Sequence, residues 1–494
     1  MLISGLALGA VLGFVMQRGR FCVTGFLRDI FTQRSWRGFV ALLIVISVHA
    51  IGLAALTSAG VITPEYNELA PVAVIVGGVI FGLGIVLAGG CASGTWYRSG
   101  EGLIGSWIAL VFYALSAAAM KTGFLGGLQN SLKDRTVGLT SIHASLGISI
   151  WPLVIALSAV TAYFAVRFLR EEFSGPRPVT LAPRKTGLAH ILAEKPWHVY
   201  ATAAIVGALG VLAWPLSAAT GRNDGLGITT PSSNLANYVV TGDTERFDWG
   251  VLLVLGILVG SFIAAKASGE FRLRVPDATQ GARSVVGGIF MGVGAAWAGG
   301  CTVGNGMVQT SLFSYQGWLA LASIAAGVAI AAKLWLKPSA PSLNDVPSAP
   351  STTNDTAVSA TAPVASAATS PVSLPGSDSA GAAGTEASPL AGSFAVAPVA
   401  LLDRSVVKQE DGKLKPLGDG RYELDTVGAV CPFPLIEAKD AINKIEVGEE
   451  LVIPFDCTQA TDAIPRWAAK DGHEVTNFEQ TGEAGWTISV RRGR

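Results

Sequence analysis

The sequence predicts an all-α polytopic membrane domain of about nine transmembrane helices, followed by a small C-terminal α/β two-layer sandwich. Hydrophobic residues make up 50% of the 494-residue chain and charged residues only 14%, with a mean hydropathy of +0.48. These values lie well outside those of an average soluble domain. Two segments 210 residues apart share the pattern Ala-Gly-Gly-Cys-x-x-Gly, once at Cys91 and once at Cys301. Such a repeat indicates a duplicated unit.

Apolar segments of spanning length define the predicted helices. A helix that crosses a bilayer needs about 20 apolar residues, or somewhat fewer when flanking residues snorkel. The first segment resembles a signal peptide, but no basic residue precedes it and Arg18 and Arg20 follow it, so we expect a retained helix. We expect helices over nine segments: 3–18, 37–58, 71–92, 103–120, 147–168, 198–216, 249–267, 284–303 and 317–336.

Basic residues collect in alternate loops, which predicts the orientation of the chain. Lys and Arg are frequent in 18–37, 167–195 and 266–283, whereas 59–70 and 304–316 contain none. Because cytoplasmic loops carry this excess, we expect the N-terminus outside and the C-terminal domain in the cytoplasm, at the inner membrane. The helices that end at the two repeated cysteines then run in opposite directions. We therefore expect inverted repeats, helices one to four against six to nine, with the fifth as a connector.

The composition changes twice after the last predicted helix. Residues 339–402 are rich in Ala, Ser, Pro and Thr, which is typical of a disordered linker between the membrane domain 1–338 and a terminal domain 403–494. In the terminal domain we expect strands over 422–426 and 450–455, helices over 434–444 and near 462–470, and two further strands. This alternation predicts the two-layer α/β fold.

Each repeated cysteine follows a Gly-Gly pair that ends at Gly90 or Gly300. A continuous helix would carry Leu or Ala at these positions, and broken backbone at membrane depth must line a cavity. Free N–H groups at the start of a half-helix attract anions, so we expect Gly90, Gly300 and the thiols of Cys91 and Cys301 to contact an anionic substrate. Close helix packing around small buried cysteines is the alternative. The occurrence in two inverted copies favours a site.

Cys22 lies just after the first predicted helix, within a cluster of arginines. The hinge expected to match it in the second half, 266–274, has no cysteine, so the repeat does not reveal its role. Arg98, Glu101, Asn305 and Gln309 are further polar candidates near the motifs, or anchors at helix ends. A thiol is a weak, soft donor, poorly suited to sulfate or phosphate but suited to an anion with a terminal sulfur. Thiosulfate is therefore the best candidate.

In the terminal domain, Cys431 stands in a Cys-Pro-Phe-Pro segment that follows a predicted strand and opens a predicted helix. A helix N-terminus lowers the pKa of a cysteine, so we expect a nucleophilic thiolate that accepts sulfur. Cys457 ends the next predicted strand, and both a resolving thiol and an inert one fit this position. The five cysteines form no CxxC pair and no dense framework, so we expect no structural disulfide, no metal and no cofactor.

Both parts of the chain resemble known families. Residues 1–338 are similar to the YeeE/YedE family of membrane proteins, and residues 403–494 to the TusA/YeeD family of sulfur carriers. The resemblance implies that Cys22, Cys91 and Cys301 relay thiosulfate through S–H contacts and that Cys431 accepts its sulfur as a persulfide or thiosulfonate. Carriers of this type generally lack Cys457. The matching motifs are Arg20-Phe21-Cys22, the two Gly-Gly-Cys segments, Gly428-x-x-Cys431-Pro432-x-Pro434, Ile464-Pro465-x-Trp467 and Gly472-His473.

These observations predict uptake of thiosulfate across the cytoplasmic membrane, coupled to sulfur transfer onto Cys431. The expected partners are thiosulfate, membrane lipid and cytoplasmic sulfur-accepting proteins, and no nucleic acid. Three alternatives stay open: a transporter of selenium or another sulfur species, a membrane-anchored sulfurtransferase, and a redox sensor with readily oxidised thiols.

Overall fold

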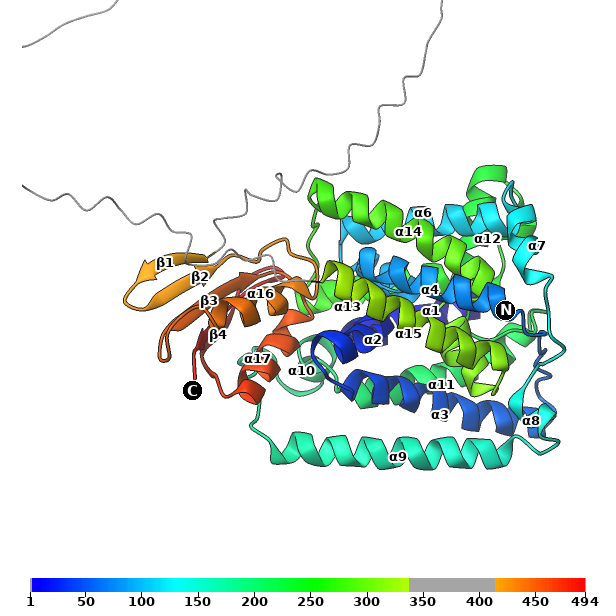
Figure 1. Cartoon of the computed structure of the whole chain (residues 1–494), viewed down its shortest axis with the longest axis horizontal. Helices are drawn as coiled ribbons and strands as arrows, with labels where there is room; N and C mark the ends of the chain where they lie inside the picture. The colour runs from blue at the N-terminus through cyan, green and yellow to red at the C-terminus, as the bar shows by residue number, and fades with distance from the viewer. Residues whose placement is uncertain (1, 337–413, 494) are drawn as a thin grey trace, which may run out of the picture. The chain divides into compact units, whose positions relative to one another are not determined.

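The computed structural model describes residues 2–336 and 414–493, and these two stretches belong to one compact unit. The first is almost entirely helical, and the second forms a five-stranded sheet with two helices (Figure 1). The predicted linker, 339–402, lies outside the described residues. The helical elements are α1 (Ile3–Arg18), α2 (Val23–Thr32), α3 (Arg37–Ser58), α4 (Pro71–Leu87), α5 (Ala92–Gly100), α6 (Ile104–Lys121), α7 (Gly126–Lys133), α8 (Ile142–Ser145), α9 (Trp151–Ser174), α10 (Gly187–Ala193), α11 (Val199–Ala218), α12 (Thr229–Thr241), η1 (Thr244–Arg246), α13 (Trp249–Ser268), α14 (Ala278–Ala298), η2 (Gly304–Gln309) and α15 (Tyr315–Trp335).

Eight helical segments of the described chain are long and apolar enough to cross a membrane. Two of them consist of a pair of helices each, because α1 continues into α2 over Ile3–Thr32 and α4 into α5 over Pro71–Gly100. The ninth predicted span, 284–303, forms α14, which is long enough but is not among the eight. It contains Arg283 and five glycines, which lower its hydropathy. The chain is a multi-pass membrane protein.

Helix packing shows two structurally equivalent halves. The helices α1 to α6 correspond in order to α11, α12, α13, α14, η2 and α15. Helix α1 packs along α13 as α11 packs along α3, and α6 packs on α14 as α15 packs on α4. In the same way α2 contacts α15 and α12 contacts α6. Helix α9 packs against α3 at the edge of the bundle and stands outside this correspondence, as expected for a connector (Figure 1).

Close approaches at glycines give the directions of the packed helices. On α1, a Cβ at Gly9 would meet the Leu253 carbonyl and one at Gly13 the Ile257 carbonyl, so α1 and α13 run parallel. On α4, Gly77 lies against Ala298, whereas Gly84 lies against Gly287. The equivalent helices α4 and α14 therefore run antiparallel, and the prediction of inverted repeats is confirmed. Small residues at such contacts let transmembrane helices pack closely.

The correspondence corrects one expectation about the second half. Because α1 is equivalent to α11, the segment that matches the hinge 19–22 is 219–228, between α11 and α12, and not 266–274. The segment 219–228 also contains no cysteine. The expectation was wrong because it matched the hinge to the loop after α13 instead of the loop after α11.

The C-terminal domain is a two-layer α/β fold, as predicted. Its strands are β1 (Leu414–Gly418), β2 (Arg421–Leu424), β3 (Glu450–Phe455), β4 (Glu474–Gly482) and β5 (Gly485–Arg491), in the sheet order β1-β2-β3-β5-β4. Only the β2–β3 pair is parallel. Helices α16 (Phe433–Ile442) and α17 (Ala460–Asp471) contact each other and the sheet, so they cover the same face. Alternate residues of β3 are buried against them, because successive side chains of a strand point to opposite faces.

Candidate functional site

The three cysteines of the membrane domain lie at breaks between helical segments. Cys22 is the N-cap of α2 and Cys91 that of α5, whereas Cys301 lies between α14 and η2. All three thiols are buried. Gly89 and Gly299 adopt φ values of +71° and +79°, a conformation that side chains other than Gly rarely tolerate. The Gly-Gly pairs therefore end their helices, as the sequence predicts.

Cys22 and Cys91 belong to one site, because their thiols lie close to each other. The Cys91 thiol also lies 3.5 Å from the Ser93 hydroxyl. A Cβ at Gly94 would lie 3.3 Å from Cys91 Sγ and 3.7 Å from Cys22 Sγ, so both sulfur atoms face the backbone of α5. The break after α1 and the break after α4 thus bring their cysteines together.

Tyr113 of α6 connects this pair to the third thiol. Its phenol lies near both Cys91 and Cys301, and its hydroxyl donates a hydrogen bond of 2.9 Å to Thr229 Oγ1. Thr229 begins α12, the counterpart of α2, and its N-cap Ile228 stands where Cys22 stands in the first half. Sequence analysis missed Tyr113 and Thr229, because neither lies in a repeated motif.

Side chains bind the carbonyl groups that the breaks set free, as buried backbone in a membrane requires. At the first break the Arg98 guanidinium donates to the Gly89 carbonyl. At the second break Asn305 Nδ2 donates to the carbonyls of Ala298 at 2.8 Å and Gly300 at 3.0 Å. Of the polar candidates near the motifs, Arg98 and Asn305 therefore hold the broken backbone in place.

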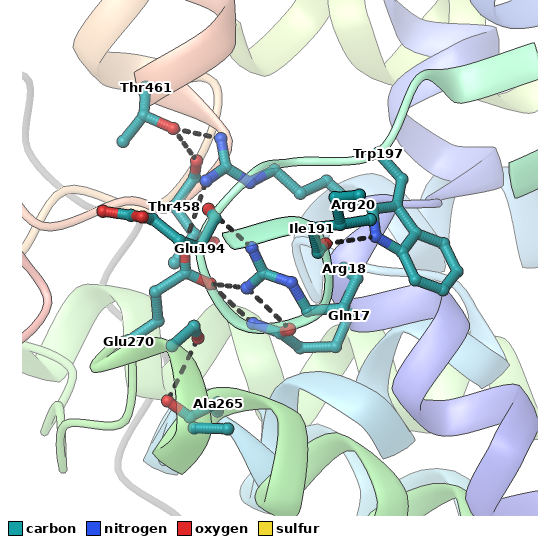
Figure 2. A network of polar contacts seen from close by, with 12 residues as sticks. Gln17, Arg18, Arg20, Ile191, Glu194, Trp197, Ala265, Glu270, Thr458 and Thr461 are labelled. Carbon is teal, nitrogen blue, oxygen red and sulfur yellow. Dashed lines mark hydrogen bonds and ion pairs between the residues drawn. The ribbon is translucent and has the colours of Figure 1, made fainter. Parts of the chain in front are cut away.

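A buried carboxylate, Glu270, holds the hinge before Cys22 (Figure 2). It accepts hydrogen bonds from Gln17 at 2.6 Å, from Arg18 at 3.3 Å and from Arg20 at 3.1 Å. Burial alone would raise the pKa of Glu270, but Arg20 and Arg18 outweigh this effect and hold the pKa below its usual range. Arg20 also donates to the Thr461 hydroxyl of the C-terminal domain. Sequence analysis missed Glu270, since its partners lie about 250 positions away in the chain.

Cys431 and Cys457 form a disulfide in the C-terminal domain, with their Cα atoms 6.2 Å apart. The expectation that the chain has no structural disulfide is therefore wrong at this pair. The start of α16 and the end of β3 place the two cysteines side by side, which their separation of 26 residues does not show. The Cys431 carbonyl accepts a hydrogen bond of 3.3 Å from Arg28 of α2.

Two cavities adjoin the Cys431 segment. The smaller, about 20 Å³, lies between Cys431, residues of α2 and α4, and Gly89, where a Cβ would lie 2.9 Å from Val430 Cγ1. The larger, about 60 Å³, is bordered by Cys431 and Cys457 together with Arg98 and Arg274. Both cavities therefore join Cys431 to residues next to the break at Gly89. Within the described residues, no group of three or more His, Cys, Asp or Glu side chains is placed to hold a metal ion.

Buried thiols at helix breaks in two inverted halves are typical of a membrane transport protein. The chain belongs to the sulphur transport family, whose model matches residues 18–330. Residues 422–492 match the model of the sulfurtransferase TusA. Both family resemblances that the sequence motifs indicated are thus confirmed.

Three relatives show how the two regions occur elsewhere. The chain is 51% identical over 328 residues to the thiosulfate transporter TsuA of Escherichia coli, covering 66% of this chain and 93% of the relative. It is 32% identical over 337 residues to the thiosulfate transporter TsuA of Spirochaeta thermophila, covering 65% and 94%. A stretch of 70 residues, 14% of this chain, is 59% identical to the putative sulfur carrier protein TsuB of E. coli and covers 93% of it.

Proposed function

We propose that the chain takes up thiosulfate across the inner membrane along a path lined by Cys22, Cys91 and Cys301, and passes its outer sulfur to Cys431. The observation that carries this proposal is the grouping of the three buried thiols at helix breaks, with Cys22 close to Cys91 and with Tyr113 near both Cys91 and Cys301. The names of the TsuA relatives support thiosulfate as the substrate.

The chemistry of the site fits an anion with a terminal sulfur. Neutral thiols are weak, polarisable donors that match the outer sulfur of thiosulfate better than the hard oxygens of sulfate. The N-termini of α2 and α5 add partial positive charge next to Cys22 and Cys91. We assign Gly90 and Gly300 to the same path, because each directly precedes a thiol and has no side chain to fill the space.

The contacts of the C-terminal domain support an inward direction. This domain contacts basic segments of the membrane domain, through Arg20 at Thr461, Arg28 at the Cys431 carbonyl and Arg184 at Gln480. Segments rich in Arg and Lys are cytoplasmic. The proposal therefore places the C-terminal domain in the cytoplasm and the N-terminus outside, with Cys431 at the inner end of the path.

Sulfur transfer at Cys431 requires the reduced form of the domain, which a cytosolic dithiol produces from the Cys431–Cys457 disulfide. The Cys431 thiolate attacks the outer sulfur of thiosulfate, a new S–S bond forms, the old S–S bond breaks, and sulfite leaves with the electron pair. Cys431 then carries a persulfide for cytoplasmic sulfur-accepting proteins. In its proposed role as a resolving thiol, Cys457 attacks Cys431 Sγ, releases hydrogen sulfide and restores the disulfide.

Uptake of labelled thiosulfate by proteoliposomes that contain the full chain tests the path. Replacement of Cys22, Cys91 or Cys301 by Ala should lower uptake to the level of empty liposomes. The matched control is Ser323→Ala, which removes one buried hydroxyl bonded only to its own helix at Leu319. Wild-type uptake by Cys91→Ala would contradict the thiol path.

Two further outcomes decide between this function and its alternatives. Selenite or sulfite that competes for uptake more strongly than unlabelled thiosulfate would make selenium or another sulfur species the cargo. If the wild-type chain showed no uptake in liposomes but still released sulfite from thiosulfate, the membrane domain would act only as an anchor for a sulfurtransferase.

A further inference from the structure

The 60 Å³ cavity next to Cys431 has a lining that the transport path does not explain. A buried water takes up roughly 10–15 Å³ on this measure, so the cavity has room for about four to six waters, or for one anion of the size of thiosulfate. Its walls come from both regions of the chain. The membrane domain contributes the start of α6, the start of α14 and the segment between α13 and α14, and the carrier domain contributes the segments that precede α16 and α17.

Four helix N-termini therefore border one cavity. Helix α6 contributes Ser106 and α14 contributes Gln280 in its first turn, whereas Cys431 precedes α16 and Gln459 caps α17. The four helices are 18, 21, 10 and 12 residues long, so each carries a developed dipole. A helix N-terminus is equivalent to roughly half a positive charge, and several that converge favour an anion between them.

Two buried donors at this cavity lack partners. The Ser284 side chain is fully buried, and its hydroxyl has no hydrogen-bond partner among the residues that the structure describes. Nε of Arg274 is likewise buried and has no hydrogen-bond partner among the described residues, although Nη2 of the same side chain donates a long hydrogen bond of 3.4 Å to the Glu270 carbonyl. Buried donors in native proteins are nearly always bonded, so these two groups indicate a ligand.

The charges around the cavity also favour an anion. Arg98 and Arg274 line the cavity together with Glu101 and Asp456. One Asp456 oxygen accepts a hydrogen bond of 3.0 Å from the Gly428 amide. Burial raises the pKa of Glu101 to about 7, although Arg274 opposes the shift, so this carboxyl is partly protonated near neutral pH. The positive charge of the arginines and helix ends is thus incompletely balanced.

We propose that the membrane domain supplies the oxyanion-binding half of the sulfur-accepting site, with Arg274 and Ser284 binding the sulfonate group of thiosulfate while its outer sulfur faces Cys431. This inference rests on the proposed function and names the residues that orient the substrate for the attack by Cys431. The same donors hold the sulfite that leaves when the S–S bond breaks. Sulfur acceptance then depends on residues of both domains, which explains why they meet at this cavity.

Sulfite release from thiosulfate by the purified full chain, in detergent and with a dithiol reductant, tests the site. A charge-assisted hydrogen bond contributes enough that Arg274→Ala should raise KM for thiosulfate about tenfold or more, and Ser284→Ala about threefold or more, with a smaller change in kcat. Arg272→Ala, at an exposed position of the same segment, should match the wild type. In the same two variants, the inhibition constant of sulfite should rise by about the same factor as KM for thiosulfate.

A second measurement separates substrate binding from a general loss of structure. Modification of Cys431 by a neutral disulfide reagent, followed by mass analysis, should proceed at the wild-type rate in Arg274→Ala and Ser284→Ala. The inference would be overturned if the KM values of Arg274→Ala and Ser284→Ala lay within twofold of the KM of Arg272→Ala. The proposed function would still stand in that case if Cys431→Ser abolished sulfite release. Sulfite release at the wild-type rate by Cys431→Ser would instead refute the sulfur-accepting role of Cys431.

Discussion

The titration of Glu101 should control the affinity of the chain for thiosulfate between pH 6 and pH 8. Burial raises the pKa of this carboxyl to about 7. It is faced by Arg98 of α5, by Arg20 of the hinge after α1, and by Arg274 and Glu270 of the segment after α13. As the pH rises through 7, Glu101 gains a negative charge at the cavity that we assign to an anion. The KM for thiosulfate should therefore rise with pH.

The size of the rise in KM follows from the ionised fraction of Glu101 and from the repulsion between its charge and the bound anion. With a pKa of about 7, roughly one Glu101 in eleven is ionised at pH 6 and roughly ten in eleven at pH 8. Two unit charges about 7 Å apart at an effective dielectric of about 20 interact by about 2 kcal/mol. Because a bound anion in turn raises the pKa of Glu101, an interaction of about 1–2 kcal/mol after screening corresponds to a rise in KM of about three- to eightfold between pH 6 and pH 8.

The assay is sulfite release by the reduced full chain at pH 6, 7 and 8. Glu101→Gln keeps the shape of the side chain and removes its titration, so its KM should change little with pH. Glu479→Gln, which neutralises an exposed carboxylate of β4, should keep the wild-type dependence. The comparison uses the ratio of KM at pH 8 to KM at pH 6, because any other pH effect on KM is common to the wild type and Glu101→Gln and cancels between them. An equal ratio in wild type and Glu101→Gln would refute the reasoning.

Three further substitutions test other parts of the structure. Glu270→Ala leaves buried arginines unpaired and should destabilise the protein by about 3–5 kcal/mol, seen as a lower unfolding temperature in detergent. Gly89→Ala costs about 1–2 kcal/mol in backbone energy and places a Cβ against Val430, next to Cys431, so it should slow sulfur transfer to Cys431. Gly60→Ala, at φ +70° in open space, is its matched control. Cys457→Ala should lower hydrogen sulfide release and let persulfide accumulate on Cys431.

Each of these expectations has an outcome that contradicts it. An unfolding temperature of Glu270→Ala equal to that of the wild type would show that the network of Figure 2 contributes little to stability. Equal sulfur transfer in Gly89→Ala and Gly60→Ala would show that contact at the helix break is unimportant. Unchanged hydrogen sulfide release by Cys457→Ala would make this cysteine inert.

The sequence predicted those features that leave a local pattern. The Gly-Gly-Cys segments marked both helix breaks because a helix end in the left-handed conformation favours Gly. The basic loops predicted helix directions that match the antiparallel α4 and α14. The length of the apolar segments identified the spans but overestimated the hydropathy of α14. The glycines of this helix allow close packing and lower its hydropathy.

The contacts that hold the site together could not be read from the sequence, because they join distant segments without a shared motif. Glu270 binds three residues of the first hinge across about 250 positions. Tyr113 lies near both Cys91 and Cys301 but is not part of either repeat motif. The disulfide of Cys431 and Cys457 depends on how the end of β3 and the start of α16 meet in the fold.

The most direct test of the account follows the outer sulfur of thiosulfate from outside the membrane to Cys431. Proteoliposomes with the full chain and an enclosed dithiol reductant are supplied externally with thiosulfate labelled in its outer sulfur, and the peptide that contains Cys431 is isolated. Cys457→Ala serves as the parent protein, because it keeps the persulfide on Cys431. The account predicts labelled persulfide on Cys431 in this parent and none when Cys91→Ala is added. Equal labelling of Cys431 with and without Cys91→Ala would contradict it.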